Sequence, residues 1–396
     1  MELATGVVLA AGEGTRLRPL TRNRPKPMLP AANRPILEYV LDTLVAAGIE
    51  ELVLVVGYRK ERVQEHFGHA YRGVPITYAV QEKQLGSGHA LLQAREAVDG
   101  PMLVVNGDRI VAEGIVADVR ETFERTGEAA LAVLDHDAAH RYGAVTLEGD
   151  HVTEIIEKPS EGSHRLINAG IYAFDESVFD AIEQAPAAEG AFPLPSAIEY
   201  LIDEDGPIHA VRTDGMWVDA TYPWDLLTVA RRVLAEGWVE EPGEGDVYVH
   251  DSARVHPDAT LAGPVAVGPD SEVGAGAVVG PNVALGRNVT VEANATVVDS
   301  VVDSDTRVGA GATLVDTVTG QGVTVGPGAV VPGGPADVRI GTEVFEGPRL
   351  GGVFADRVTL GGGATVAPGA LVGTEATIAT GAHVAGNVDD EAEVVR

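Results

Sequence analysis

The sequence predicts two domains, an α/β domain with a mostly parallel sheet followed by a left-handed parallel β-helix. Three observations lead to this prediction: the length of 396 residues, the alternation of apolar strand and helix segments before residue 236, and a six-residue repeat after residue 250. A chain of this length exceeds one typical hydrophobic core. Residues 236–250 are rich in Gly and Glu and carry no helical period. We therefore expect an α/β domain over 1–235, a linker over 236–250 and a repeat domain over 251–396.

The α/β domain is predicted from apolar runs and amphipathic segments that alternate along the chain. The expected strands are 6–10, 52–57, 76–80 and 102–106, and the clearest helices are 36–47 and 88–97. Alternating βαβ units favour a mostly parallel sheet with helices on both faces. Ligands of such sheets bind at the carboxyl ends of the strands, so we expect the functional site there.

The repeat domain is predicted from aliphatic residues spaced six apart. The first series comprises Val255, Leu261, Val267, Val273, Val279, Leu285, Val291 and Val297. Two five-residue steps follow, and an excursion from about residue 332 to 352 interrupts the repeat before it resumes at Phe354. Three six-residue segments per coil are typical of a triangular parallel β-helix with one aliphatic side chain per segment inside.

The composition is strongly acidic and excludes several classes of function. The formal net charge is −31, only four lysines are present, and there is no cysteine. Disulfides and thiol chemistry are therefore excluded, and nucleic acid or an anionic membrane is a poor partner. No apolar run is long enough to span a membrane, and a cytoplasmic enzyme is expected. The acidic, lysine-poor surface resembles that of proteins from salt-accumulating haloarchaea, although an ordinary acidic mesophilic enzyme stays possible.

The segment LAAGEGTRLRPLT directly follows the first predicted strand. Gly12 and Gly14 allow a tight turn whose backbone N–H groups approach phosphate oxygens. Leu17 stands where the dinucleotide-binding fingerprint needs its third glycine, and no Gly-Lys-Ser/Thr of a P-loop follows. The glycines alone are weak evidence of a phosphate site.

Six basic residues and no acidic residue lie between Gly14 and Leu37. Such a cationic segment in so acidic a protein indicates an anionic substrate, although a solvated basic loop paired with acids elsewhere would give the same pattern. Lys26 lies between Pro25 and Pro27, which exclude helix and fix the backbone around its ammonium group.

The motifs GEGTRLRPLT and PKPMLP together resemble the signature of the sugar-1-phosphate nucleotidylyltransferases, which include glucose-1-phosphate uridylyl- and thymidylyltransferases and N-acetylglucosamine-1-phosphate uridyltransferases. The resemblance implies a Rossmann-like nucleotidyltransferase domain in which Arg16 and Lys26 are catalytic and hold the triphosphate. The segment QEKQLGSGHALLQA is similar to the family's nucleobase loop, although Ser87 could equally be a helix cap. The implied nucleotide-binding residues are Leu9, Ala11, Gly12, Gly14, Thr15, Gln81, Gly86 and Ser87.

Two aspartates are expected to hold Mg²⁺. Asp108 ends an apolar strand in VVNGDRI, and Asp219 lies in WVDATYPWDLL, which resembles the family's W-x-D segment. Mg²⁺ usually takes one or two carboxylates together with phosphate oxygens and water. Each aspartate alone could instead be a helix cap or turn residue. By the same resemblance, the sugar-phosphate-binding residues are Gly143, Glu157, Lys158 and Asn168.

The implied reaction transfers a nucleotidyl group from UTP or dTTP to a sugar-1-phosphate, either glucose-1-phosphate or N-acetylglucosamine-1-phosphate, and releases pyrophosphate. The β-helix is expected to assemble the chain into a homotrimer or a multiple of it. Two alternatives stay open. The β-helix could also acetylate an amino sugar phosphate from acetyl-CoA, although its histidines (His250, His256 and His383) lie near the domain ends. The chain could also be a non-catalytic regulatory subunit.

Overall fold

The computed structural model describes residues 3–137, 139–157, 159–160, 165–187, 190–204 and 206–395. The chain forms two compact units. Unit 1 contains residues 1–13, 25–28 and 36–218, and unit 2 contains residues 14–24, 29–35 and 219–396. The signature segment is therefore divided, because most of GEGTRLRPLT belongs to unit 2 whereas PKPM belongs to unit 1.

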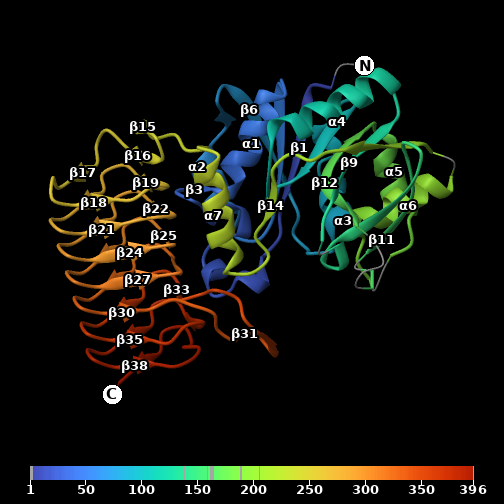
Figure 1. The fold of residues 1–396 in the computed structure, drawn as a ribbon. Helices are drawn as coiled ribbons and strands as arrows, with labels where there is room; N and C mark the ends of the chain where they lie inside the picture. The colour runs from blue at the N-terminus through green and yellow to red at the C-terminus, as the bar shows by residue number, and fades with distance from the viewer. Residues whose placement is uncertain are drawn as a thin grey trace. The chain divides into compact units, whose positions relative to one another are not determined.

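Unit 1 is built on a ten-stranded sheet in the order β10-β11-β13-β9-β12-β7-β1-β4-β6-β5 (Figure 1). Its strands are β1 (Thr5–Ala10), β4 (Glu51–Val56), β5 (Ala70–Tyr71), β6 (Val74–Val80), β7 (Met102–Asn106), β9 (Ala129–Asp135), β10 (Gly143–Glu148), β11 (His151–Glu157), β12 (Leu166–Phe174) and β13 (Ile208–Arg212). The four strands β6, β4, β1 and β7 are parallel as expected, and β13 is parallel to β9. The sheet as a whole is mixed, because β12 runs antiparallel between β7 and β9.

Helices cover both faces of this sheet. They are α1 (Ile36–Ala46), α2 (Lys60–Phe67), α3 (Ser87–Leu92), α4 (Glu113–Thr126), α5 (Ser177–Gln184) and α6 (Leu194–Asp203). Val8 of β1 belongs to the core that includes α1 and α4, and the adjacent Val7 belongs to the core that includes α3, α5 and α6. Successive strand residues point to opposite faces, so this central strand is apolar throughout. The helix expected over 88–97 is shorter: α3 ends at Leu92 and a 3-10 turn follows at Arg95–Ala97.

Unit 2 contains the hairpin of β2 (Pro30–Ala31) and β3 (Arg34–Pro35), the helix α7 (Asp225–Ala235), and a strand-rich segment that we call the hexad region, residues 247–394. Strand β14 (Trp217–Asp219) spans the end of unit 1 and the start of this part of unit 2. Within unit 2, α7 lies against strands β22, β25 and β28 of the hexad region. No helix of the described residues is both long enough and apolar enough to cross a membrane.

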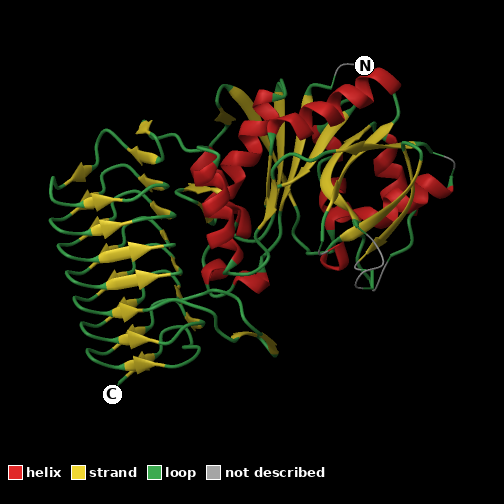
Figure 2. Ribbon diagram, in the orientation of Figure 1, coloured by secondary structure: helices red, strands yellow, loops and turns green. Residues whose placement is uncertain are grey.

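The hexad region consists of three parallel sheets whose strands follow one another in rotation, an arrangement consistent with a β-helix (Figure 2). The first sheet contains β16 (Val247–Val249), β19 (Val265–Val267), β22 (Val283–Leu285), β25 (Val301–Val302), β28 (Thr317–Thr319), β33 (Gly352–Phe354) and β36 (Ala370–Val372), and β15 (Gly243–Glu244) pairs antiparallel with β16. The second contains β17 (Arg254–Val255), β20 (Glu272–Val273), β23 (Thr290–Val291), β26 (Arg307–Val308), β29 (Thr324–Val325), β34 (Thr359–Leu360), β37 (Thr377–Ile378) and β39 (Glu393–Val394). The third contains β18 (Thr260–Leu261), β21 (Val278–Val279), β24 (Thr296–Val298), β27 (Thr313–Val315), β30 (Val330–Val331), β35 (Thr365–Val366) and β38 (His383–Val384).

The six-residue repeat places one aliphatic side chain per strand in a common interior. Val267, Val273 and Val279, one from each sheet, are almost fully buried and belong to one core. The excursion near residues 332–352 contains an antiparallel hairpin of β31 (Val338–Ile340) and β32 (Glu343–Phe345). Phe345 of this hairpin packs against Tyr222 and Trp224, so the excursion makes its own contacts within unit 2.

Candidate active site

The loop that the sequence predicts to bind phosphate begins where β1 ends at Ala10. Gly14 has a φ of 68°, a left-handed conformation that glycine adopts without strain, and its carbonyl accepts a hydrogen bond from Thr21 Oγ1 at 2.8 Å. A short 3-10 turn, Thr15–Leu17, follows and presents Arg16 on its surface. Arg16 is exposed and forms no ion pair with the residues that the structure describes. Its guanidinium is therefore available to an anion.

The carbonyl groups of Leu9 and Ala11 join the loop of unit 1 to neighbouring segments. Leu9 accepts from Gly107 N at 3.0 Å, and Ala11 accepts from Gln84 Nε2 at 2.8 Å. These bonds connect the end of β1 to the turn after β7 on one side and to the segment after β6 on the other. Hydrogen bonds therefore connect the segments at the carboxyl ends of the central strands. Ligands of such sheets bind at these ends.

Lys26 and Asp108 form the ionic centre of unit 1. Asp108 follows β7 by two residues, and its Oδ2 lies 2.6 Å from Lys26 Nζ. The Lys26 side chain is 12% exposed and that of Asp108 is 35% exposed, so the pair is reachable from solvent. The structure thus joins a residue expected to bind triphosphate to one expected to bind the metal ion.

The cationic segment is not uniformly available to a ligand. Arg22 pairs with Asp390 at 3.1 Å, and Arg34 pairs with Glu240 at 3.4 Å. The guanidinium of Arg24 pairs with two aspartates of the hexad region, Asp303 and Asp356. The pairing of basic residues with distant acids, which the sequence left open, therefore applies to these three arginines.

Arg24 lies in a buried site that we call the Arg24 socket, formed by Arg24, Asp303 and Asp356. Its guanidinium is 2.5 Å from Asp303 Oδ2 and 3.2 Å from Asp356 Oδ1, and all three side chains are less than a tenth exposed. Burial by itself lowers the pKa of the Arg24 guanidinium, but the charges of Asp303 and Asp356 outweigh burial and raise the pKa above its usual value.

Asp303 and Asp356 lie in turns of the hexad region that hold their carboxylates in the socket by backbone hydrogen bonds. Asp303 follows β25 at the position that glycine occupies after the neighbouring strands, at Gly286 and Gly320. Its Oδ1 accepts from Ser304 N at 2.7 Å, and Asp356 Oδ1 accepts from Gln321 N at 3.0 Å. A Cβ atom at Gly320 would lie 2.5 Å from Asp356 Oδ1, so only glycine leaves room for that carboxylate.

The segment expected to bind the nucleobase is a loop closed by its own hydrogen bonds. Gln81 is 3% exposed, and its Nε2 donates to Gly86 O at 3.1 Å and lies 2.9 Å from His89 Nδ1. Gly86 has a φ of 98°, and a Cβ atom there would lie 2.8 Å from Phe192 O. Ser87 is the first residue of α3 and accepts from Leu194 N at 2.9 Å, whereas Gly86 occupies the N-cap position.

Three residues expected on the acceptor side lie together at neighbouring strands of unit 1. Gly143 and Glu157 are cross-strand partners of β10 and β11. A Cβ atom at Gly143 would lie 3.4 Å from Glu157 Oε2 and 3.8 Å from Asn168 Cβ, so a side chain there would fill the space between them. Asn168 donates from Nδ2 to Tyr172 Oη at 2.8 Å, and burial raises the pKa of this tyrosine. Lys158 lies outside the described residues.

Arg109, which directly follows Asp108, lies against a candidate site residue, Asn168, and the sequence reasoning did not single it out. Its Nη1 donates to Asn168 O at 3.2 Å, and its guanidinium lies 5.2 Å from the centre of the Trp217 ring. A Cβ atom at Gly170 would lie 2.5 Å from Arg109 Nη1, which explains the glycine after Asn168-Ala169. The only signal in the sequence was a basic residue shortly after a predicted strand in an acid-rich chain.

Asp219 belongs to unit 2, and it is the last residue of β14. Its Oδ2 accepts from Thr221 Oγ1 at 2.8 Å. The following turn is fixed by Asp225 Oδ2, which accepts from the backbone N–H groups of Thr221 and Tyr222. The carboxylate of Asp219 is therefore held by its local turn.

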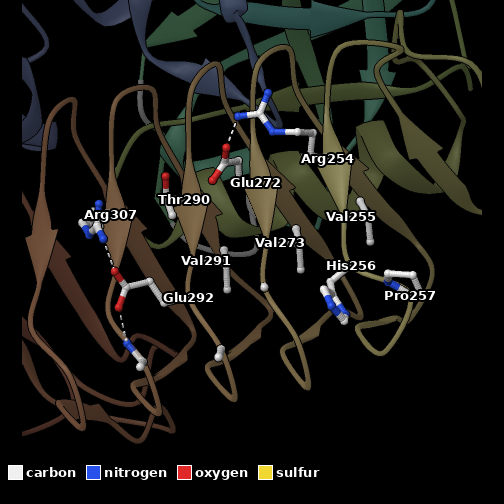
Figure 3. Close-up of a pocket in the computed structure, with 13 residues that line it drawn as sticks. Arg254, Val255, His256, Pro257, Glu272, Val273, Thr290, Val291, Glu292 and Arg307 are labelled. Carbon is white, nitrogen blue, oxygen red and sulfur yellow. Dashed lines mark hydrogen bonds and ion pairs between the residues drawn. The ribbon is translucent and has the colours of Figure 1, made fainter.

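A hollow of about 690 Å³ lies on the hexad region, over its second sheet (Figure 3). His256 is the one histidine of the three in this region that lines it. Arg254 pairs with Glu272 across this surface, and Arg307 pairs with Glu292. The charged groups of the hollow thus neutralise each other in pairs.

Comparison with known proteins agrees with the geometry of both regions. The model of the Nucleotidyl transferase family matches residues 5–236, and that of the GMPPB C-terminal domain matches residues 261–360. The chain is 42% identical over 234 residues to UTP–glucose-1-phosphate uridylyltransferase AglF of Haloferax volcanii, covering 58% of this chain and 96% of that protein. It is 36% identical over 265 residues to the bifunctional protein GlmU of Methanococcus maripaludis, covering 64% of this chain and 62% of that relative.

Solved structures resemble about three fifths of the chain in fold. A putative glucose-1-phosphate thymidylyltransferase from Bacillus anthracis matches with a TM-score of 0.54 at 27% identity, covering 61% of this chain and 97% of that one. A UDP-glucose pyrophosphorylase bound to UDP-glucose matches with a TM-score of 0.54 at 20% identity, over 59% of this chain and 99% of that one, and this likeness concerns the fold alone. The resemblance drawn from GEGTRLRPLT and PKPMLP is confirmed. Because the family model covers more than half of its length, the chain belongs to the nucleotidyl transferase family.

Proposed function

We propose that the chain transfers a nucleotidyl group from UTP or dTTP to glucose-1-phosphate or N-acetylglucosamine-1-phosphate, forming a nucleotide sugar and pyrophosphate. The observation that carries the proposal is the contact of Lys26 Nζ with Asp108 Oδ2, 2.6 Å apart beyond the carboxyl end of β7. The names of the uridylyl- and thymidylyltransferase relatives support the same reaction class.

The reaction needs positioning and charge neutralisation more than proton transfer. The sugar phosphate attacks the α-phosphorus as an oxyanion, so the chain need not supply a general base. In our proposal Lys26 and Arg16 bind the triphosphate and offset the negative charge that grows on the leaving pyrophosphate. Lys26 already lies against an acid, which holds its ammonium group in place before substrate arrives.

The nucleobase is proposed to bind the loop from Gln81 to Ser87. Gln81 Nε2 donates to Gly86 O and lies within hydrogen-bond distance of His89 Nδ1, and we propose Gln81 Oε1 as the acceptor for an imide N–H of uracil or thymine. Gly86 contributes backbone groups next to it. The sugar phosphate is proposed to bind at Gly143, Glu157 and Asn168, with Lys158 on its phosphate.

The donor set is compatible with a divalent cation. Asp108 has its carboxylate beyond a strand end, with the Lys26 ammonium 2.6 Å from its Oδ2. We propose that Asp108 and Asp219 hold Mg²⁺, which would neutralise phosphate charge when bound. Lys26 then serves two partners, the carboxylate in the free enzyme and the phosphates in the complex.

The hexad region is proposed to be a left-handed parallel β-helix that assembles the chain as a trimer. The predominant six-residue step and the three parallel sheets support this proposal. The catalytic domain is proposed to span residues 1–235 and the β-helix 251–396, joined by 236–250. A net charge of −31 supports adaptation to high salt, because molar salt shortens the Debye length to about 3 Å.

Pyrophosphate release in molar KCl tests the function. UTP and dTTP are each combined with glucose-1-phosphate and with N-acetylglucosamine-1-phosphate, and at least one pair should turn over with Mg²⁺. Acetyl-CoA consumption with glucosamine-1-phosphate is measured in parallel and should stay at background. Absence of turnover with every pair would favour the regulatory alternative, and acetyl transfer would favour the bifunctional one.

A further inference from the structure

A cluster of two histidines and one glutamate lies in unit 1, at three adjacent strands. We call it the His–Glu cluster, and its members are Glu128, His151 and His209. Glu128 precedes β9, His151 begins β11, and His209 is the second residue of β13, which lies between the other two strands. His151 and His209 are cross-strand partners. The backbone of a regular sheet therefore fixes the origins of all three side chains.

The donor atoms converge on one point. Glu128 Oε2 lies 2.7 Å from His209 Nε2 and 3.6 Å from His151 Nε2, and the three donor atoms lie within 4.8 Å of one another. The two imidazole rings lie with their centres 4.4 Å apart and their planes inclined by 39°. Zinc bonds of about 2.0–2.2 Å in a tetrahedron separate ligand atoms by roughly 3.3–3.5 Å. Small rotations of these side chains would bring all three to that spacing.

The Glu128 side chain is 36% exposed, but its Oε2 atom faces the two histidines and lacks a well-aligned hydrogen bond. Its Oε2 is shielded from water and accepts no hydrogen bond of acceptable geometry from any described residue, although His209 Nε2 is only 2.7 Å away. A buried carboxylate oxygen without a donor is costly. A cation held jointly by this oxygen and the two ring nitrogens would remove that cost.

We propose that Glu128, His151 and His209 bind a divalent transition-metal ion of the zinc class. Two imidazole nitrogens with one carboxylate favour Zn²⁺, Ni²⁺ or Cu²⁺ over Mg²⁺, which prefers oxygen ligands. Three protein ligands leave a fourth position of a tetrahedral ion for water. The ion would tie together the ends of β9, β13 and β11, strands that are distant in the sequence.

This site is separate from the proposed catalytic residues. His151 is the first residue of β11 and Glu157 is the last. Six residue steps of extended strand span about 20 Å. The His–Glu cluster and the proposed sugar-phosphate residues therefore occupy opposite ends of the same strand, and zinc binding should be measurable without any turnover.

Zinc binding to the full-length chain tests the proposal. ZnCl₂ is titrated calorimetrically into the protein at pH 7.5, with Mg²⁺ in excess to occupy the catalytic carboxylates. One zinc ion per chain is expected in the wild type, and at least about tenfold weaker binding is expected in His151→Gln and in His209→Gln. Zinc should raise the Tm of the wild type and not that of His209→Gln, because an ion that binds only the folded state stabilises it.

Two further variants make the result specific. His256→Gln removes an exposed histidine beside Asp258 in the hexad region, a pair to which no described residue adds a third donor, and this variant should bind zinc as the wild type does. His151 is 46% exposed, so its replacement should leave the fold intact by circular dichroism. Wild-type affinity in His151→Gln and His209→Gln would overturn the proposal, as would zinc binding that disappears in Asp108→Asn instead.

Discussion

Lys26 and Arg24 are two residues apart in the sequence and have opposite environments. Lys26 belongs to unit 1 and pairs with one aspartate whose side chain is 35% exposed. Arg24 belongs to unit 2 and pairs with two aspartates that are sealed from solvent. A cation whose aspartate partner is partly exposed can exchange that partner for a phosphate, whereas a buried cation between two sealed aspartates cannot leave them. The difference separates the residue that we propose to bind a ligand from a residue that stabilises the fold, although both belong to one motif.

The largest effect on activity is expected when Asp108, the partner of Lys26, is replaced. Asp108→Asn removes the carboxylate that faces Lys26 and that we propose as a metal ligand, and turnover should fall by about 10²–10³-fold or more. The fold should be retained, because Asp108 is partly exposed. Pyrophosphate release measures the loss, and thermal unfolding checks the fold. The exposed Asp180→Asn serves as a matched control, and near-normal activity of Asp108→Asn would contradict the assignment.

The largest effect on stability is expected from the Arg24 socket. Arg24→Met leaves Asp303 and Asp356 buried without their counter-charge, and breaking such a pair from one side costs about 3–5 kcal/mol in the free energy of unfolding. Urea unfolding at fixed KCl concentration measures this cost.

A triple variant distinguishes charge from packing in the socket. Arg24→Met combined with Asp303→Asn and Asp356→Asn removes all three charges and keeps acceptors for Ser304 N and Gln321 N. The triple variant should recover most of the stability lost in Arg24→Met. Equal loss in both variants would show that the guanidinium contributes through shape alone.

The sequence revealed the repeats and the motif family, because both are periodic or local patterns. Strands β1, β4, β6 and β7 lie where the apolar runs predicted them, within two residues at each end. The helix over 88–97 was predicted too long, because the segment favours helix intrinsically whereas α3 ends at Leu92 and Arg95–Ala97 form a 3-10 turn in which Arg95 pairs with two acids of α5. Local propensity does not include such tertiary contacts.

Composition could not predict which basic residues of the segment pair with distant acids and which stay available to a ligand. Arg16, Arg22, Arg24 and Lys26 are equivalent as charges in a sequence, and the acids that select among them lie up to several hundred residues away. One signal did exist in the repeat itself. Asp303 interrupts a column of turn glycines at Gly286 and Gly320, and a buried charge where glycine is the rule indicates a specific partner.

An intermediate effect on the free energy of unfolding is expected at Asp316. Its side chain is as buried as those of the aspartates in the Arg24 socket, but its arginine partners are more exposed than Arg24. Its side chain is 0% exposed, and it pairs with Arg231 at 3.3 Å and Arg349 at 3.0 Å, whose side chains are 33% and 61% exposed. Asp316→Asn keeps acceptor capacity and tolerates the φ of 50°. Urea unfolding should show a loss of about 1–3 kcal/mol, below that of Arg24→Met. A loss as large as that of Arg24→Met would mean that burial of the carboxylate alone sets the cost.

The smallest effect on the free energy of unfolding is expected at the exposed pair of Arg22 and Asp390, which has one aspartate where the socket has two and lacks the burial of the socket. The two side chains are 52% and 36% exposed, and their atoms are 3.1 Å apart. Water and salt screen such a pair, so Arg22→Ala should change the free energy of unfolding by no more than about 1 kcal/mol. The change should shrink further between 0.1 M and 1 M KCl, as the Debye length falls from about 10 Å to about 3 Å. Urea unfolding at the two salt concentrations measures both quantities, and a salt-independent loss as large as that of Arg24→Met would show that exposure does not explain the difference between the two arginines.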